Sequence, residues 1–309
     1  VKGVGAVPNK KGVVVKKRSN WNAIGTVGRG NLISGNDSCG IELSTSANIV
    51  YGNIIGLQLN GQSPLGNGAD GILIPNPSGA NFIGSAGGGT GNVISANQGN
   101  GVRLIGSALS AVQGNIIGLT VDSTSGAGNL GHGILLDTNC YWNRIGHDSV
   151  YGYNIIGDND GCGIKLHLTS GLHTIAGNHI GTVFDGDSFG DFGNGSHGIL
   201  IEENSFWPSR IGDSTVDGSW NAIGYNGGDG IAIIGDHGNR LYRNLCHSND
   251  GLAIDLEDNG VTANDALDAD LGANLLMNYP VLTTATACPN GVLVDGTLDS
   301  EPNQWFRIE

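Results

Sequence analysis

Short apolar runs recur along the chain at a nearly constant interval. Each begins with glycine and continues with apolar residues, as in "GIEL" at position 40, "GILI" at 71 and "GILL" at 133. Eight such runs occur between residues 40 and 254, and successive runs lie 30 to 35 residues apart until a final step of 21. Two other short runs, of the types "NRIG" and "GNIIG", recur within each repeat. A fixed period of this length is typical of a repeat architecture.

Three short runs per repeat, each closed by glycine or asparagine, predict the three strands of one coil of a parallel β-helix. Because side chains alternate across a strand, the first and third apolar residues of each "GIxL" run are expected to point inward. Eight coils stacked at the spacing of parallel strands would form a rod of about 40 Å. Each coil is then stable only through its neighbours.

Asparagine stands at the head of many of these runs, where a sharp corner between sheets is expected. Asparagine tolerates the left-handed backbone conformation of such corners, and stacked amides can hydrogen-bond to one another. The sequence therefore predicts an amide ladder along the rod, formed by Asn53, Asn92, Asn115, Asn154, Asn178 and Asn221.

Insertions divide the repeats into two alternating kinds. Long insertions follow the third run in every second repeat, at residues 57–69, 119–131 and 182–196. The other repeats carry a loop between the second and third runs instead. The true unit is therefore two coils, and the long loops are expected to emerge in register along one edge of the rod.

Composition supports an all-β repeat protein and narrows the range of partners. Glycine accounts for 55 of 309 residues, which argues against helix bundles because glycine weakens helix interiors. The net charge is −14, and six of the 14 lysines and arginines lie in the first 18 residues. Such an acidic body would repel phosphate backbones, so nucleic acid is not an expected partner. No apolar run is long enough to predict a membrane span.

Several phrases in the repeats resemble those of bacterial secreted proteins with right-handed parallel β-helix domains. The phrases are "GNxIG", "GNVISxN" and "GNGxxGI", and residues 251–282 are similar to the segment that closes such helices. Residues 291–309 resemble the first strands of a small β-sandwich. The resemblance implies a secreted or cell-surface bacterial protein.

We expect the chain to have four parts: a basic segment (1–18), the β-helix (19–254), an acidic closing segment (255–282) and the beginning of a β-sandwich-like domain (283–309).

The face of the first strand type gathers the polar residues that could carry chemistry. If the coils stack in register, one patch of about three coils contains the candidate catalytic residues His132, Asp137, Lys165, His167, His197 and Glu202. Other right-handed β-helices are polysaccharide lyases, hydrolases and epimerases. By that resemblance, Lys165 or His167 could be the base of a lyase, with Arg103 or a Ca²⁺ ion held by Glu202 and Glu203 as the neutralising group. In a hydrolase, Asp137 and Glu202 could be the paired carboxylates.

His132 stands in the phrase "GHGILL", which resembles the "GHG" of the pectin hydrolases with this fold. Those enzymes also carry paired aspartates one coil earlier and an "RIK" one coil later, whereas here "DNDGCGI" follows the histidine and no "RIK" occurs. The equivalent position in the other repeats holds aspartate, asparagine, cysteine or, in "SHGILI", a second histidine, His197. The comparison favours a structural role for His132.

The closing segment is a candidate metal site. Acidic side chains are dense there, and Ca²⁺ prefers such hard oxygen ligands. The predicted calcium ligands are Asp255, Asp258, Asp265, Asp268 and Asp270. The alternative is a solvated acidic loop. The sequence suggests no organic cofactor, and the five cysteines form no CxxC pair, which argues against zinc.

Trp142 and Trp207 precede the same strand type two coils apart, so their rings are expected about 10 Å apart. Together with Arg103 they are the candidate carbohydrate-binding residues; the alternative is that corner aromatics seal the core.

Two functions remain open from the sequence. The first is a noncatalytic extracellular or cell-surface module, a rigid stalk, adhesin or assembly component that binds a polysaccharide or a cell-surface component. The second is a polysaccharide lyase, hydrolase or epimerase with a groove on the first-strand face. The oligomeric state is left open.

Overall fold

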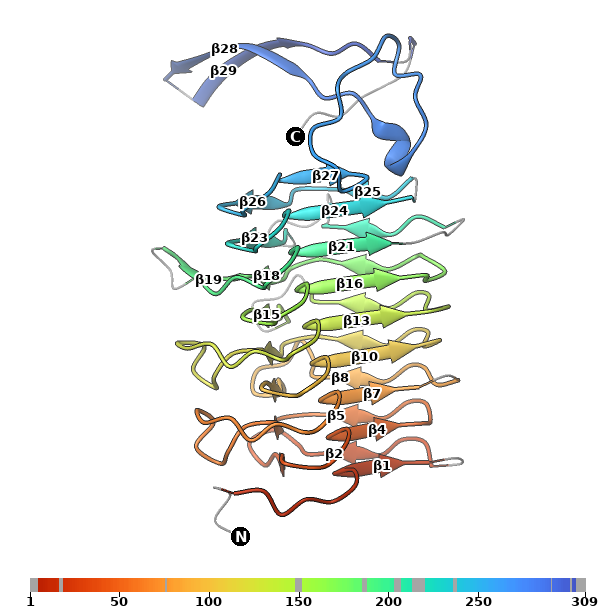
Figure 1. Ribbon diagram of the computed structural model, residues 1–309, viewed down its shortest axis with the longest axis vertical. Coiled ribbons are helices and arrows are strands. Elements are labelled where there is room, and N and C mark those ends of the chain that lie inside the picture. The colour runs from red at the N-terminus through yellow and green to blue at the C-terminus, as the bar shows by residue number, and fades with distance from the viewer. Residues whose placement is uncertain are drawn as a thin grey trace.

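The computed structural model is a right-handed parallel β-helix built from three sheets. It describes residues 5–16, 19–75, 77–147, 152–184, 188–202, 207–212, 220–235, 238–289, 291–300 and 302–303. Figure 1 shows the coils stacked along the long axis, with the first coil near the N-terminus and the C-terminal hairpin beyond the last coil.

Each sheet takes one strand from each coil, and neighbouring strands are parallel. The first sheet consists of β1 (Val13–Val15), β4 (Ile41–Leu43), β7 (Ile72–Ile74), β10 (Val102–Ile105), β13 (Ile134–Asp137), β16 (Ile164–His167), β21 (Ile199–Glu202), β24 (Ile231–Ile234) and β27 (Ile254–Leu256). The second consists of β2 (Ala23–Ile24), β5 (Ile49–Val50), β8 (Phe82–Ile83), β11 (Ala111–Val112), β14 (Arg144–Ile145), β17 (Thr174–Ile175), β22 (Arg210–Ile211) and β25 (Arg240–Leu241). The third consists of β3 (Leu32–Ile33), β6 (Ile54–Ile55), β9 (Val93–Ile94), β12 (Ile116–Ile117), β15 (Ile155–Ile156), β18 (His179–Ile180), β23 (Ala222–Gly224) and β26 (Leu245–His247).

The predicted strands are confirmed, with differences at both ends of the stack. β1 pairs with β4, so the first sheet begins before the predicted boundary at residue 19. At the other end β27 begins at Ile254, because Ile254 pairs with Ile231. The predicted strand in the run "GLAI" at 251 is therefore shifted. Most of the run precedes the last strand, which starts at Ile254, the final residue of the run.

The core consists of aliphatic side chains stacked in layers, one layer from each coil. Along β7, for example, Ile72 and Ile74 are fully buried while Leu73 between them points outward. Burying one such side chain stabilises a fold by about 1.5–3 kcal/mol. Since each strand has only two to four residues in these sheets, this burial is available only when coils stack.

The predicted asparagine ladder is confirmed at the corner before the third sheet. The Asn53 side-chain amide donates to Asn92 Oδ1 (2.9 Å), Asn92 donates to Asn115 (2.9 Å), and the series continues through Asn154 and Asn178. The Oδ1 atoms of Asn92, Asn115 and Asn154 also accept a backbone N–H from the preceding asparagine of the series. The ladder therefore fixes both the corner and the register between coils.

A second asparagine ladder, not expected from the sequence, lines the corner between the third and first sheets. Its members are fully or largely buried and each donates to the next: Asn36, Asn67, Asn97, Asn129, Asn159, Asn194, Asn226 and Asn249. Glycine precedes this ladder where the chain comes close to the next coil. At Gly118 the backbone has φ 86°, and a Cβ would lie 1.9 Å from the Gly157 carbonyl oxygen.

The long insertions protrude along one edge, as predicted, and appear on the left of Figure 1. The third insertion folds as the antiparallel pair β19 (Thr182–Phe184) and β20 (Phe189–Asp191). Gln62 of the first insertion donates a hydrogen bond to Asp122 of the second (3.0 Å). The first and second insertions therefore contact one another across the coil that lies between them.

The chain after the last coil forms a short 3-10 turn, η1 (Ala273–Leu276), and an antiparallel hairpin of β28 (Val281–Cys288) and β29 (Gly291–Thr297). Both hairpin strands are exposed throughout. That this hairpin begins a β-sandwich stays a prediction. The five cysteines are free thiols, and Cys39, Cys140 and Cys162 are buried.

Removing one ladder amide should destabilise the rod. In Asn97→Ala the Asn67 amide loses its acceptor and Asn129 Oδ1 loses its donor. An unsatisfied buried polar group costs about 1–3 kcal/mol, so we expect a loss of about 3 kcal/mol in the free energy of unfolding, measured by urea denaturation. The neighbouring Gln98→Ala, at an exposed position, should change it by less than about 0.5 kcal/mol. Equal effects of the two substitutions would contradict a structural ladder.

Candidate functional site

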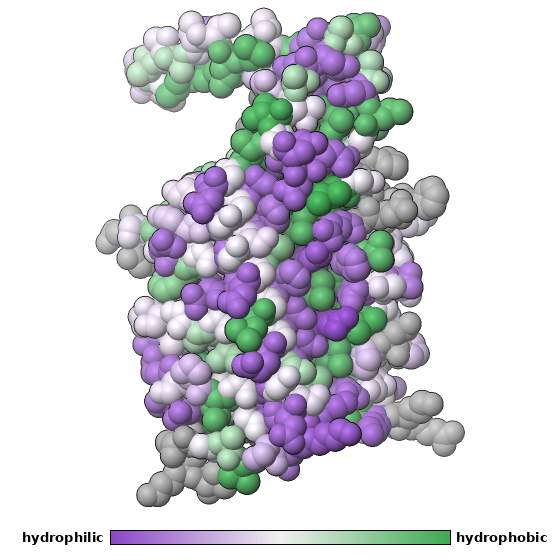
Figure 2. All heavy atoms as spheres, in the orientation of Figure 1, coloured by the Kyte–Doolittle hydropathy of each residue, from purple (hydrophilic) through white to green (hydrophobic). Residues whose placement is uncertain are grey.

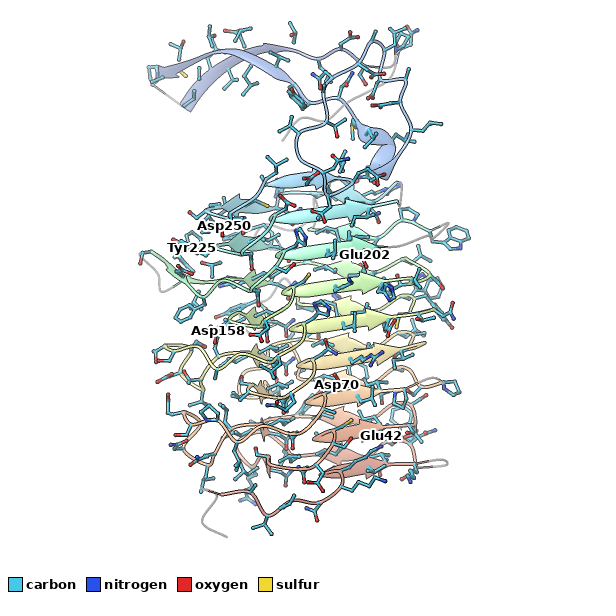
Figure 3. The ribbon with its side chains drawn as sticks, in the orientation of Figure 1. Glu42, Asp70, Asp158, Glu202, Tyr225 and Asp250 are labelled. Carbon is cyan, nitrogen blue, oxygen red and sulfur yellow. The ribbon has the colours of Figure 1, made fainter. Side chains whose placement is uncertain are left out.

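The outer face of the first sheet carries the column of side chains that the repeats predict. Strand pairing places Glu42 beside Leu73, Arg103 beside Leu135, and Lys165 beside Leu200. Figure 3 shows Glu42 and Glu202 over this sheet, and in Figure 2 hydrophilic and hydrophobic side chains alternate along it. The run "GLAI" at 251 predicts Ala253 as the last member of this column, but Asp255 takes that place. It pairs with Ala232, because β27 begins later than predicted.

Asp137 is the centre of the first polar group on this face. Arg103 Nη2 lies 2.6 Å from one carboxylate oxygen, His167 Nδ1 lies 3.1 Å from the other, and the Thr138 hydroxyl donates to that second oxygen at 2.9 Å. Burial by itself would raise the pKa of Asp137, but the hydrogen bonds from Arg103, His167 and Thr138 outweigh it and lower the pKa to about 2. Asp137 is therefore ionised at neutral pH and holds both basic side chains.

Lys165 and Glu202 form the second polar group. Lys165 Nζ lies 2.8 Å from Glu202 Oε2, and both side chains are largely shielded, with exposed fractions of 19% and 31%. The structure thus brings Asp137, Lys165, His167 and Glu202 onto one face, as the sequence predicts, but it pairs each cation with a carboxylate. Glu203, the other acidic candidate there, lies outside the described residues.

His132 belongs to a column of hydrogen-bond acceptors just before the first sheet. Asp70 accepts from the Asn100 backbone N–H (2.8 Å), Asn100 accepts from that of His132 (2.9 Å), and His132 Nδ1 accepts from that of Cys162 (2.9 Å). Burial, together with the nearby charge of Lys165, lowers the pKa of His132 to about 4. At neutral pH the ring is therefore uncharged, and its Nδ1 lone pair is occupied by the backbone.

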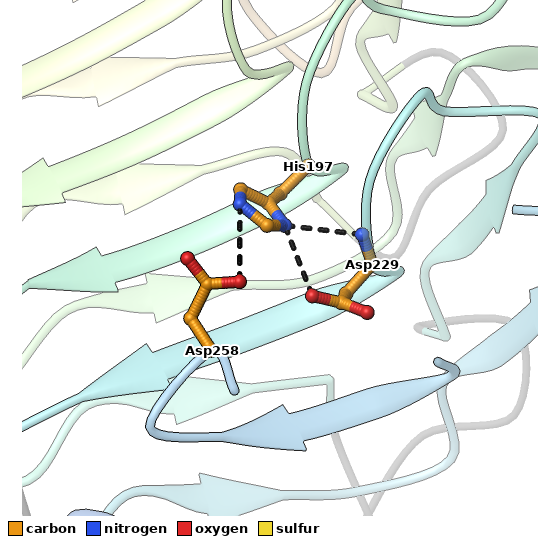
Figure 4. A group of neighbouring side chains, drawn as sticks. All are labelled: His197, Asp229 and Asp258. Atoms are coloured by element: carbon orange, nitrogen blue, oxygen red, sulfur yellow. Dashed lines mark hydrogen bonds and ion pairs between the residues drawn. The ribbon is translucent and has the colours of Figure 1, made fainter. Parts of the chain in front are cut away.

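His197 has the same role two coils further on, where its Nδ1 accepts from the Asp229 backbone N–H (3.0 Å). Asp229 continues the column by accepting from the Leu252 N–H (2.6 Å). The second ring nitrogen of His197 faces Asp258, with Nε2 and Oδ1 3.6 Å apart (Figure 4). His197 is thus a contact between the coil stack and the closing segment.

The five aspartates predicted as one calcium site fall into three places. Asp265, Asp268 and Asp270 each offer an oxygen within 4.8 Å of the others, and Asp270 Oδ1 is buried without a hydrogen-bond partner among the described residues. Asp258 instead groups with His197 and Asp229. Asp255 is 3% exposed and accepts from the Gly260 backbone N–H (2.8 Å). Asp255 thus lies against the backbone of the turn that follows β27. The prediction that all five aspartates bind one calcium ion is therefore wrong.

The aromatic candidates lie exposed at the corner between the first and second sheets. Trp142 and Trp207 are 54% and 61% exposed, and Tyr141 is 45% exposed with its ring centroid 6.3 Å from that of Trp142. These rings do not seal the core. Arg103, predicted to act with them, is bound to Asp137 on the first sheet.

One group of functional candidates was missed. The runs "NRIG", "SRIG" and "NRLY" place Arg144, Arg210 and Arg240 in one register column on the second sheet. The arginine that these three runs share at one position is the signal in the sequence that identifies this column.

Comparisons with known proteins establish the fold and leave the activity open. No protein-family model and no curated protein matches the chain. Among solved structures, a double mutant of the periplasmic alginate epimerase AlgG matches with a TM-score of 0.54 and 16% sequence identity. The match covers 77% of this chain and 48% of that one, so this chain spans about half the length of the matched structure. No helix in the described part of the chain is long and apolar enough to cross a membrane. The chain therefore shares the parallel β-helix fold with the matched structure, at an identity that shows the fold alone.

Proposed function

We propose that the protein is a noncatalytic, extracellular polysaccharide-binding β-helix module. The observation that carries this proposal is the exposure of Tyr141, Trp142 and Trp207 along one corner of a rigid rod. Aromatic rings offer flat apolar faces to sugar rings, and exposed apolar groups gathered in one place mark interaction sites. β14 and β22 are separated by one intervening strand, β17, so a chain along the axis meets an aromatic about every 10 Å.

The state of the first-sheet face favours binding over catalysis. A general base needs a free lone pair within reach of the substrate proton, whereas the Nδ1 atoms of His132 and His197 accept backbone hydrogen bonds. The cation that would neutralise a uronate carboxylate is also bound, since Arg103 and Lys165 each hold a carboxylate of this chain.

The matched structure supports a polysaccharide as the ligand class. That protein is an alginate epimerase, so the same fold serves a protein that acts on a polysaccharide. Fold does not fix activity, and the enzymatic alternative therefore rests on local geometry. The observation in its favour is His167, which lies beside Asp137 and keeps 41% of its side chain exposed.

Removing either tryptophan ring should weaken glycan binding. A ring contact contributes about 0.5–1.5 kcal/mol, so Trp142→Ala and Trp207→Ala are each expected to weaken binding roughly two- to twelvefold. The measurement is calorimetric titration against a panel of soluble neutral and acidic polysaccharides. Trp142→Phe keeps a ring at the same position and should retain most of the affinity. Alanine variants that bind as tightly as the unaltered protein would contradict the proposal.

No turnover is expected on the same panel. The assays are release of unsaturated or reducing ends, and exchange of sugar ring protons with D₂O followed by NMR, which also detects an epimerase. Any activity that disappears in His167→Ala or Lys165→Ala, and is kept in Arg29→Ala, would establish the enzymatic alternative instead.

For the acidic closing segment we propose calcium binding by Asp265, Asp268 and Asp270. The support is their mutual distance and the unpartnered oxygen of Asp270. Calcium at about 100 times its dissociation constant would stabilise the fold by about 2.7 kcal/mol, so Ca²⁺ should raise the melting temperature and a chelator should lower it. Asp270→Asn should abolish the shift and Asp37→Asn, on the first coil, should retain it. A melting temperature that calcium leaves unchanged would refute the site.

A further inference from the structure

The outer face of the second sheet carries a column of arginines. Arg144 pairs with Thr174, Thr174 pairs with Arg210, and Arg210 pairs with Arg240 in successive strands. Adjacent parallel strands lie about 4.8 Å apart, so the column extends over roughly 14 Å along the axis. Arg144 and Arg240 are exposed, while Arg210 and Thr174 are half-buried.

This column concentrates positive charge in an acidic protein. The chain has a net charge of −14, and only eight lysines and arginines follow residue 18. Three of those eight lie in this one column. On the first sheet, by contrast, Arg103 and Lys165 are each bound to a carboxylate. Within the described ranges, neither Arg144 nor Arg240 forms an ion pair.

The second sheet does not need arginine at these positions. Outward positions of the same column elsewhere hold Ala23, Ile49 and Phe82. Arg144 and Arg240 can therefore serve to bind an anion from outside the chain. The guanidinium group suits such a ligand, because its fork of N–H donors matches carboxylate, sulfate and phosphate oxygens.

The arginines follow the corner aromatics closely in the chain. Asn143 and Ser209, which precede Arg144 and Arg210, are buried with exposed fractions of 1%. Trp142 and Arg144, on either side of Asn143, are both exposed. A ligand on this surface therefore meets an aromatic ring and a guanidinium group from the same coil.

We propose that the second-sheet face binds a linear anionic polysaccharide that lies along the rod, with its acidic groups on the arginine column and its sugar rings on the corner aromatics. This inference rests on the proposed function and specifies its ligand class. The pair of an aromatic and an arginine recurs two coils apart, at Trp142 with Arg144 and at Trp207 with Arg210. A polymer with an acidic group on each sugar also repeats its charge at a fixed step. Apart from the basic segment 1–18, the remaining chain is acidic and repels polyanions, so among the faces of the coils we expect binding at this one.

The test compares polyuronate, sulfated polysaccharide, neutral glucan and single-stranded DNA as ligands by calorimetric titration. We expect the two acidic polysaccharides to bind and to weaken with added salt. Arg144→Gln and Arg240→Gln should each weaken binding about fivefold, the size of one exposed charge contact. The matched control Arg29→Gln removes the same charge from an exposed loop position and should leave the affinity unchanged. All three variants should keep the melting temperature of the unaltered protein.

The outcomes separate this inference from the proposed function. Loss of binding in the tryptophan variants with full binding in Arg144→Gln and Arg240→Gln would overturn the inference and leave the proposed function standing. Equal binding of neutral glucan, equal binding of DNA, or an equal loss in Arg29→Gln would also overturn the inference. No binding of any polysaccharide would overturn both.

Discussion

Stacking of one coil on the next is the interaction on which the whole structure depends. A strand of two or three residues, as in most of these sheets, buries too little surface to persist alone. Its inward isoleucine becomes buried only when the coils above and below are in place. The two asparagine ladders then fix the register, because a buried amide that slips by one residue loses both its donor and its acceptor.

This register turns a period in the sequence into columns on the surface. Every outward position is repeated about 4.8 Å further along, so a residue type that recurs at one place in the repeat becomes a stripe. Three stripes have different chemistry: paired charges on the first sheet, exposed aromatics at the next corner, and arginines on the second sheet. The proposed polysaccharide would follow the last two, since a polymer with its own repeat suits a surface with a matching one.

The acceptor column explains why a histidine stands in "GHGILL". At the position before the glycine, Asp70, Asn100 and His132 each present a lone pair to a backbone N–H of the next coil. Aspartate, asparagine and a neutral histidine can all do so. His132 therefore resembles a catalytic residue by its neighbours in the sequence while its Nδ1 performs a structural task. Its lowered pKa has the same origin, since burial in the wall of the rod disfavours the charged ring.

The architecture follows from the sequence pattern alone. Period and alternation predict the strands, their three sheets and the first asparagine ladder. They also predict that one face carries Asp137, Lys165, His167 and Glu202. Tertiary structure decided how those groups are used. Ion pairing joins side chains of different coils, so only the folded register shows that Arg103 is held by Asp137 and Lys165 by Glu202. The closing segment has no repeat, and its aspartates were separated by contacts that spacing does not encode, such as that of Asp258 with His197. Local periodicity fixes where a side chain points, whereas its partner is fixed by residues about 30 positions away that only folding brings beside it.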